Sequence, residues 1–422
     1  MGAPSLWHSG TVHRKGGVAT WCALVLVLAA ACGGASADDD EMAPELVWYT
    51  GPDRIDAEAL AEDCTVQAAG NYTIAVESLP ADFDERHAFL VRRMLAEDDS
   101  IDLFTLDGSL TSEFSAARFL APIPEDLKEP FAEDVFPAAL LAASDGQQLV
   151  TAPWWYDPYL LWWSGATAER AGLDPDEPIS WEQLLAGAGR TGATIEIDDP
   201  AGNAVPAIVN ALLDGAGGTL LDGQGRSPRV GLDSGAGRTA AEILRTAGDL
   251  GAGEPDGLAP RRFAASDSAF LLAPSSVVSD PALVGVGREL QWTAFPVVDE
   301  AAPPGEGAGL AVPLYAARTD LSYDAIQCLT STSSQRTLML ESGHGPARST
   351  LYADEDVVAA YPLADVTEPS VRSAVTVPAS PYWARARSAL LSTWEPLTGI
   401  DPGSTPAASA DAVTDAVAGR LP

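Results

Sequence analysis

The sequence has few basic residues. Against 60 aspartates and glutamates stand only 24 lysines and arginines, which gives a formal net charge of −36 at pH 7. A surface of this sign repels phosphate groups, so nucleic acid is excluded as a partner, and so is electrostatic binding to an anionic membrane. The acidity keeps a protein soluble and says little about what it binds.

Histidine and cysteine are also scarce, with four of each among 422 residues. No CxxC pair occurs, and only His87 and His344 follow residue 31, so we expect no zinc or haem site and no cofactor. We find no GxSxG, HExxH, Walker A or SxxK pattern and predict no catalytic residue. These absences favour a binding protein. An exported glycosidase remains an alternative, because 60 acidic residues supply carboxylate pairs by chance.

Long hydrophobic runs are missing except near the amino terminus. Residues 18–31 are apolar, follow the basic residues 13–15 and are too short to span a bilayer comfortably, which is typical of a signal peptide. Small residues precede Cys32, as a lipoprotein signal peptidase requires. We therefore predict a lipoprotein signal peptide over 1–31 and a lipidated tether over 32–43. The lipid would hold the protein on the extracellular face of the cell membrane. An ordinary cleaved signal peptide with an incidental cysteine is the alternative.

Two cysteines remain once Cys22 leaves with the signal peptide and Cys32 takes the lipid. These are Cys64 and Cys328. Outside the cytoplasm two such thiols most economically form one disulfide, which would join an early helix to a late one. Two separate buried thiols are the alternative.

Strand and helix patterns alternate along the chain. Such alternation predicts an α/β fold with a mostly parallel sheet, in which ligands bind at the carboxyl ends of the strands. Strands are expected at 45–50, 72–79, 100–106, 268–273 and 291–296, and helices at 55–64, 84–97, 204–213, 237–250 and 321–342. Ser180 is expected to cap a further helix.

The centre of the chain is rich in aromatic residues. Residues 151–163 contain four tryptophans and two tyrosines. Adjacent residues of a strand face opposite sides, so at least one of Trp162 and Trp163 must be buried, and we assign both mainly to core packing.

The order of these features resembles the extracellular solute-binding proteins of carbohydrate ABC importers, in particular the trehalose- and α-glucoside-binding lipoproteins of actinobacterial importers. The resemblance covers residue 32 to the end. It rests on the export signal, the lipidated cysteine, the order of strands and helices, and the segments Ala152–Trp155, Thr330-Ser331 with Gln335 and Met339, and Pro378–Trp383.

The resemblance implies a two-lobed α/β fold of the periplasmic-binding-protein type (type II), with a ligand cleft between the lobes. Lobe 1 would comprise 44–152 and 297–348, and lobe 2 would comprise 153–296 and 349–422. Cys64 would then share lobe 1 with its partner, in agreement with the disulfide. The implied partners are a small carbohydrate and the permease subunits of an ABC importer, and a monomer is expected.

The resemblance also implies a set of ligand-binding residues. A sugar needs carboxylates or amides for its hydroxyl groups and aromatic rings for its C–H faces. Asp107 matches the family's ligand-binding aspartate after the third strand, with a helix N-cap as its structural alternative. The other members of the predicted set are Trp154, Trp155 and Asp157 at the crossing between lobes, Tyr49 and Asp53 near the first strand's end, and Tyr382 and Trp383 in the late motif.

Three positions depart from the similar proteins, and at the first of them Asp157 stands where asparagine is usual. Residues 269–275 lack the stacking tryptophan of the trehalose-binding proteins, and Val377 stands where those proteins have arginine. We therefore predict an importer-linked binder of a disaccharide or α-glucoside, such as trehalose or a related glycoside. A surface lipoprotein that kept the fold but lost the cleft chemistry, and transports nothing, is a further alternative.

Overall fold

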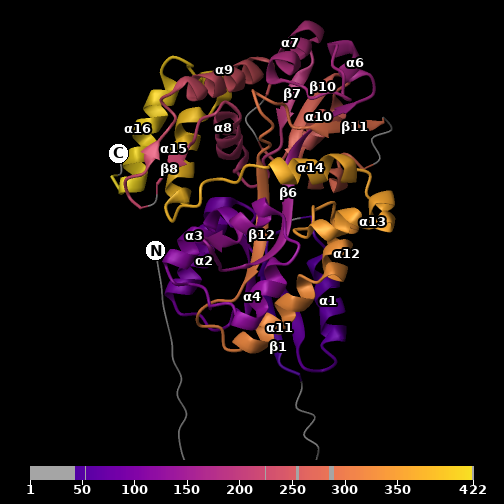
Figure 1. Ribbon diagram of the computed structural model, residues 1–422, viewed down its shortest axis with the longest axis vertical. Helices are drawn as coiled ribbons and strands as arrows, with labels where there is room; N and C mark the ends of the chain where they lie inside the picture. Colours follow the sequence, from indigo (N-terminus) through magenta and orange to yellow (C-terminus); the bar gives the residue numbers. More distant parts are fainter. Residues whose placement is uncertain (1–42, 53, 224, 253–255, 285–288, 421–422) are drawn as a thin grey trace, which may run out of the picture. The chain divides into compact units, whose positions relative to one another are not determined.

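The computed structural model describes residues 43–52, 54–223, 225–252, 256–284 and 289–420, which form a mixed α/β fold (Figure 1). Residues 1–42 hold the predicted signal peptide, Cys32 and most of the tether, so these predictions lie outside the described residues. Among the described residues, no helix has the length and apolar character needed to cross a bilayer.

One eight-stranded sheet organises the fold, in the order β2-β1-β3-β12-β6-β10-β7, with β11 also paired to β6. Its strands are β1 (Glu45–Thr50), β2 (Thr73–Ser78), β3 (Leu103–Asp107), β6 (Ala152–Ser164), β7 (Thr194–Ile197), β10 (Ala269–Pro274), β11 (Leu290–Ala294) and β12 (Gly305–Ala311). Two small hairpins add β4 (Ser144–Asp145), β5 (Gln148–Leu149), β8 (Leu221–Asp222) and β9 (Arg229–Val230).

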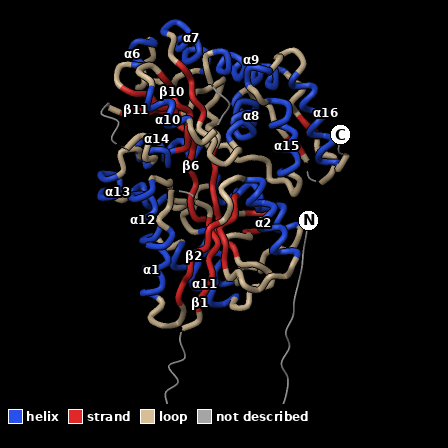
Figure 2. Tube along the Cα trace, turned by 180° about the vertical axis from the view of Figure 1, so that it is seen from behind, coloured by secondary structure: helices blue, strands red, loops and turns tan. Residues whose placement is uncertain are grey.

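The long strand β6 belongs to two lobes. Its first half pairs with β12, and its second half pairs with β10 and β11. Seen from behind in Figure 2, the strands run as a band from β1 and β2 through β6 to β10. We call the region around β1, β2, β3 and β12 lobe 1, and the region around β7, β10 and β11 lobe 2.

The prediction of a mostly parallel sheet is correct only for the outer strands. Strand β1 runs parallel to β2 and β3, and β10 runs parallel to β7. The pairings made by β6 and β12 are all antiparallel, because these two strands carry the chain between the lobes in opposite directions. The predicted two-lobed α/β fold is therefore confirmed, with a mixed sheet.

Helices of lobe 1 lie in the lower half of Figure 1. They are α1 (Ala57–Gln67), α2 (Phe83–Leu95), α3 (Thr111–Ala116), α4 (Glu125–Ala132), α5 (Pro137–Ala142), α11 (Thr319–Leu329) and α12 (Thr332–Ser342), with the short 3-10 helix η1 (Gly108–Leu110). Helix α2 begins because the Asp82 side chain accepts the Glu85 amide, and it buries Phe83, Leu90 and Met94 against the core.

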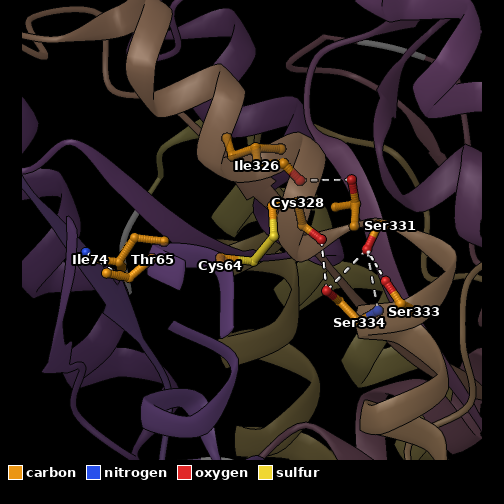
Figure 3. Close-up of a disulfide and its surroundings, with 9 residues drawn as sticks. Cys64, Thr65, Ile74, Ile326, Cys328, Ser331, Ser333 and Ser334 are labelled. Atoms are coloured by element: carbon orange, nitrogen blue, oxygen red, sulfur yellow. Dashed lines mark hydrogen bonds between the residues drawn. A yellow bond between two sulfur atoms is a disulfide. The ribbon is translucent and has the colours of Figure 1, made fainter. Parts of the chain in front are cut away.

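A disulfide joins α1 to α11. Cys64 and Cys328 are bonded with their Cα atoms 5.8 Å apart, which confirms the predicted pairing (Figure 3). The single helix predicted over 321–342 is wrong, because it is two helices interrupted at Thr330 and Ser331. The Ser331 hydroxyl accepts the Ser334 amide at 3.3 Å and so begins α12.

Lobe 2 carries its helices on both faces of the sheet. They are α6 (Thr167–Ala171), α7 (Trp181–Thr191), α8 (Ala204–Gly215), α9 (Gly235–Asp249), α10 (Ala259–Ala265), α13 (Glu355–Ala360), α14 (Ala364–Ser373), α15 (Trp383–Trp394) and α16 (Thr405–Ala418), with 3-10 helices η2 (Ser275–Ser279), η3 (Ser349–Ala353) and η4 (Leu397–Gly399). Ser180 caps α7 and exchanges side-chain and backbone hydrogen bonds with Gln183, as expected of a capping box. Trp162 and Trp163 are both buried in the core, as predicted.

Candidate functional site

Two neighbouring cavities lie where the lobes meet. The large cavity has a volume of about 260 Å³ and the small cavity about 90 Å³. Asp107, Asn203, Glu306 and Gly307 line both of them, so the two cavities form one gap. This gap lies at the carboxyl end of β3, where ligands of α/β sheets bind.

Asp107 occupies the position predicted for a ligand-binding aspartate. It is the last residue of β3, and its side chain accepts the Ser109 amide at 2.8 Å. Its second carboxylate oxygen accepts from the Asn203 amide group at 3.4 Å. Asp107 therefore caps η1 and faces the gap at once, so the helix-cap and binding interpretations are compatible.

Trp155 and Trp383 also face the gap. Trp155 on β6 lines the large cavity, and Trp383 at the start of α15 lines the small one. The indole of Trp155 lies 4.6 Å from the imidazole of His344, measured between ring centroids. Each tryptophan supplies an apolar face of the kind that packs on sugar C–H groups.

Asp157 is buried behind this wall rather than exposed on it. Its carboxylate accepts from the Gly345 amide at 2.6 Å, from the Ser275 hydroxyl at 3.1 Å and from His344 Nδ1 at 2.6 Å. Asp157 lines neither cavity, because three protein donors already use its oxygens.

The other predicted site residues lie elsewhere. Trp154 packs on Trp48 in the core of lobe 1, with ring centroids 5.4 Å apart. Tyr49 packs beside Phe89, and Tyr382 lies beneath the guanidinium groups of two surface arginines. None of these three lines either cavity, and Asp53 lies outside the described residues.

Several gap-lining residues escaped the sequence prediction. Among the polar ones are Arg54, Arg86, Asn203, Glu306 and His344. Two of them follow the rule used for Asp107, since Arg54 comes shortly after β1 and Asn203 after β7. Glu306 lies in a glycine-rich stretch that does not show the alternation of a strand. No motif in the sequence marks His344 as a site residue.

Polar contacts bridge the lobes on both sides of the gap. Arg54 of lobe 1 contacts Asp280 of lobe 2 at 2.8 Å and Asp198 at 3.5 Å. On the other side, the buried guanidinium of Arg387 lies 4.2 Å from the ring centroid of Phe83 in lobe 1 and donates to Asp84 at 2.9 Å. The lobes are therefore in contact around the gap.

Arg387 also organises the loop that carries Asn203. It donates to the Asn203 side-chain oxygen at 2.7 Å and to the Gly202 carbonyl at 2.6 Å. The amide group of Asn203 is thereby turned, with its nitrogen toward Asp107. A buried arginine that contacts this loop thus fixes the direction of an amide inside the gap.

Two carboxyl groups beside this loop are hard to ionise. Burial raises the pKa of Asp198 to about 6, although the nearby Arg54 works in the opposite direction. Burial raises the pKa of Asp199 to about 7, against hydrogen bonds from the backbone amides of Ala204 and Asn203.

The arrangement offers polar groups of both kinds beside aromatic faces. Carboxylates accept hydroxyl protons, while amide and guanidinium groups donate to hydroxyl oxygens. In the part of the chain that the structure describes, no group of three or more His, Cys, Asp or Glu side chains could hold a metal ion. The gap can therefore bind a polyhydroxylated molecule through direct contacts.

Comparison with known proteins gives one family. The sequence model described as "Bacterial extracellular solute-binding protein" matches residues 71–336. A probable ABC transporter-binding protein of Deinococcus radiodurans is 21% identical over 350 residues, which cover 76% of this chain and 80% of that protein.

Solved structures with the same fold come from several bacteria. The maltose-bound MalE3 of T. maritima superposes with a TM-score of 0.74 at 18% identity, covering 90% of this chain and all of that one. The GacH receptor of Streptomyces glaucescens, studied with acarbose, gives 0.74 at 20% identity over 89% and 99% of the two chains. UgpB of Mycobacterium tuberculosis, in complex with glycerophosphocholine, gives 0.74 at 16% identity over 89% and 98%.

Proposed function

The chain belongs to the bacterial extracellular solute-binding protein family, and we propose that it is the substrate-binding protein of an ABC importer for a small carbohydrate. The lobes would close on the ligand and deliver it to the permease. The proposed lobe limits are 44–152 with 297–348, and 153–296 with 349–422. The protein would be a monomer, held at the extracellular face of the membrane by a lipid on Cys32.

The observation that carries this proposal is the composition of the gap. Asp107 of lobe 1 and Asn203 of lobe 2 meet across it at 3.4 Å, and Trp155 and Trp383 line its two cavities. A ligand that satisfies acceptors and donors of both lobes stabilises their closed arrangement. Hydroxyl groups can do this as donors and acceptors at once.

The finer proposal is a disaccharide or α-glucoside, such as trehalose or a related glycoside. The maltose bound to the T. maritima protein and the acarbose bound to GacH support a glucoside. Val377 lines the small cavity, so the arginine of the trehalose-binding proteins is replaced there by an apolar surface. We therefore expect trehalose to bind less tightly than a related glycoside.

The test is a binding screen with the purified full-length protein. Trehalose, maltose, glucose, glycerol and glycerophosphocholine would be compared by thermal shift and then by isothermal titration calorimetry. A sugar at 100 times its Kd should stabilise the protein by about 2.7 kcal/mol. Glycerophosphocholine serves as the phosphate-bearing control. Arg54 and Arg86 of the large cavity would attract its phosphate, whereas the three acidic residues that line the same cavity would repel it.

Each outcome of the screen separates the candidate functions. Saturable binding of a sugar without product supports the proposal, whereas turnover of a disaccharide would favour the glycosidase. If none of these compounds bound, the result would contradict the proposal and favour a surface lipoprotein whose cleft no longer binds a ligand. Binding of glycerophosphocholine alone would replace the carbohydrate with a phosphodiester.

Trp155→Ala tests whether the gap is the binding site. Loss of this indole from the large cavity should weaken binding of the screened sugar by about 2 kcal/mol. Trp292→Ala is the matched control, because Trp292 is half-buried against Trp162 and lines neither cavity. Equal affinity in both variants would mean that the sugar binds somewhere else.

A further inference from the structure

Two neighbouring rings at the large cavity carry polar atoms without a protein partner. Among the described residues, Trp155 Nε1 and His344 Nε2 are buried and make no hydrogen bond. Both residues line the large cavity, and their rings are 4.6 Å apart. A buried polar atom without a partner costs about 1–3 kcal/mol, so proteins keep few of them. Their position at the cavity suggests that a ligand satisfies them.

The contact of His344 with Asp157 places a proton on one ring nitrogen. His344 Nδ1 lies 2.6 Å from one carboxylate oxygen of Asp157, and the other oxygen accepts from the Gly345 amide and the Ser275 hydroxyl. A carboxylate can only accept, so the proton of this bond belongs to Nδ1. In a neutral imidazole the remaining nitrogen, Nε2, is then an acceptor.

We propose that His344 Nε2 accepts a hydrogen bond from a ligand hydroxyl in the large cavity, while Trp155 Nε1 donates one to the ligand. Asp157 is a positioning residue that holds the imidazole in its Nδ1–H form. The inference rests on the proposed function and deepens it, because it assigns a specificity-determining pair to the gap.

The pair selects for a neutral hydroxylated ligand. A hydroxyl group can donate to the imidazole and accept from the indole, so one group or two adjacent ones satisfy both rings. A carboxylate has no proton for His344, and an ammonium group has no acceptor for Trp155. Each would leave one buried ring nitrogen without a partner, and such mismatches reduce binding strongly.

The same pair is unsuited to nucleophilic catalysis. A histidine held by a carboxylate activates a serine, threonine or cysteine only when its second nitrogen bonds to that side chain. In the described part of the chain, His344 Nε2 makes no such bond. We therefore assign the dyad to ligand contact rather than to catalysis.

The first test is the tautomer, which requires no ligand. Long-range ¹H–¹⁵N correlation spectra of the full-length ¹⁵N-labelled protein at pH 7.5 distinguish the two neutral imidazoles and the imidazolium, and the His344→Asn variant assigns the signal. We expect the neutral Nδ1–H form in the wild type. An Nε2–H form or an imidazolium would overturn the inference.

Asp157→Asn should invert this tautomer. Its amide oxygen can keep the bonds from Gly345 and Ser275, which places its NH₂ group against His344 Nδ1. That nitrogen must then accept, so the proton moves to Nε2. Sugar binding should weaken about three- to tenfold, the effect of one hydrogen bond. An unchanged spectrum in a folded variant would show that Asp157 does not set the tautomer and overturn its role.

Two substitutions of His344 separate its two nitrogens. Asparagine places its amide near Nδ1 and can still donate to Asp157, whereas glutamine reaches the position of Nε2. With the tightest-binding sugar of the screen, His344→Asn should bind about three- to tenfold more weakly at an unchanged Tm. His344→Gln should keep its affinity within about threefold but lower the Tm, because Asp157 loses a donor.

The outcomes distinguish this inference from the proposed function. Wild-type affinity in His344→Asn, with a sugar that Trp155→Ala binds more weakly, would overturn the ligand contact and leave the carbohydrate importer intact. If no sugar of the screen bound, the contact would fall together with the proposed function. The tautomer would still be settled by the spectra.

Discussion

Removing the disulfide should destabilise the protein more than most single changes. Cys64 on α1 is fully buried, and Cys328 on α11 is half-buried beside it. The bond joins residues 264 positions apart in the sequence, so it closes a loop that includes most of both lobes. Cys64→Ala/Cys328→Ala is the suitable variant, because alanine leaves no polar group at the buried position.

The expected loss can be worked out from the loop length. For a loop of this size, the loss of chain entropy in the unfolded state corresponds to about 5–6 kcal/mol, while measured losses for native disulfides are about 2–5 kcal/mol. Domains are typically stable by about 5–15 kcal/mol. We therefore expect the double variant to lose about 2–5 kcal/mol and to have a clearly lower urea midpoint.

Urea unfolding followed by tryptophan fluorescence measures this effect. Trp48 and Trp154 lie in the core of the lobe that holds the disulfide, so their signal reports on it. The wild type should lose stability when a reducing agent is added, and the double variant should not respond. Equal midpoints for the oxidised wild type, the reduced wild type and the variant would refute the reasoning. Alkylation of Cys64 and Cys328 in the unreduced, denatured protein would refute the bond itself.

Two further predictions concern the anchor and the pH dependence. Cys32→Ala should release the protein from membranes into the medium, and unchanged retention in the membrane fraction would contradict a lipid at this residue. The pKa of Asp199 is raised to about 7 in the folded protein, so folding holds its proton and its ionisation costs stability as the pH rises from about 4 through 7. Asp199→Asn should therefore stabilise the protein at pH 8, by at most about 4 kcal/mol, and should have no such effect below pH 4. Urea unfolding of both proteins between pH 4 and pH 8 measures this. A difference in stability that does not change with pH would contradict the reasoning.

Local patterns were sufficient to predict much of the fold. The predicted strand at 45–50 matches β1, and the predicted helix at 84–97 overlaps α2 closely. Both carry strong apolar periodicity between clear end signals. The disulfide followed from the export signal and the number of cysteines, without any structural information.

The errors occurred where one residue type hides the pattern. Strand β12 (Gly305–Ala311) was not among the predicted strands, because Gly305 and Gly307 have no side chain to show the strand's alternation. The structure explains the glycine, since a Cβ atom at Gly307 would lie 2.6 Å from the Tyr156 ring. The break between α11 and α12 was missed because a serine cap inside a helical pattern resembles an ordinary polar position.

The binding gap shows why spacing alone could not give the site. The resemblance placed Trp154, Trp155 and Asp157 of β6 at the cleft, and strand alternation alone puts Trp155 and Asp157 on the same face. Asp157 can only accept, and the fold surrounds it with three donors, one of which is His344, 187 residues away. The Asp157 carboxylate therefore lies behind the His344 imidazole, and the imidazole lines the cavity. The asparagine that the resemblance implies at this position would donate where Asp157 accepts. Under the proposal above, Asp157 and His344 therefore set the specificity of the gap together, and a change at either residue should alter what the other offers to the ligand.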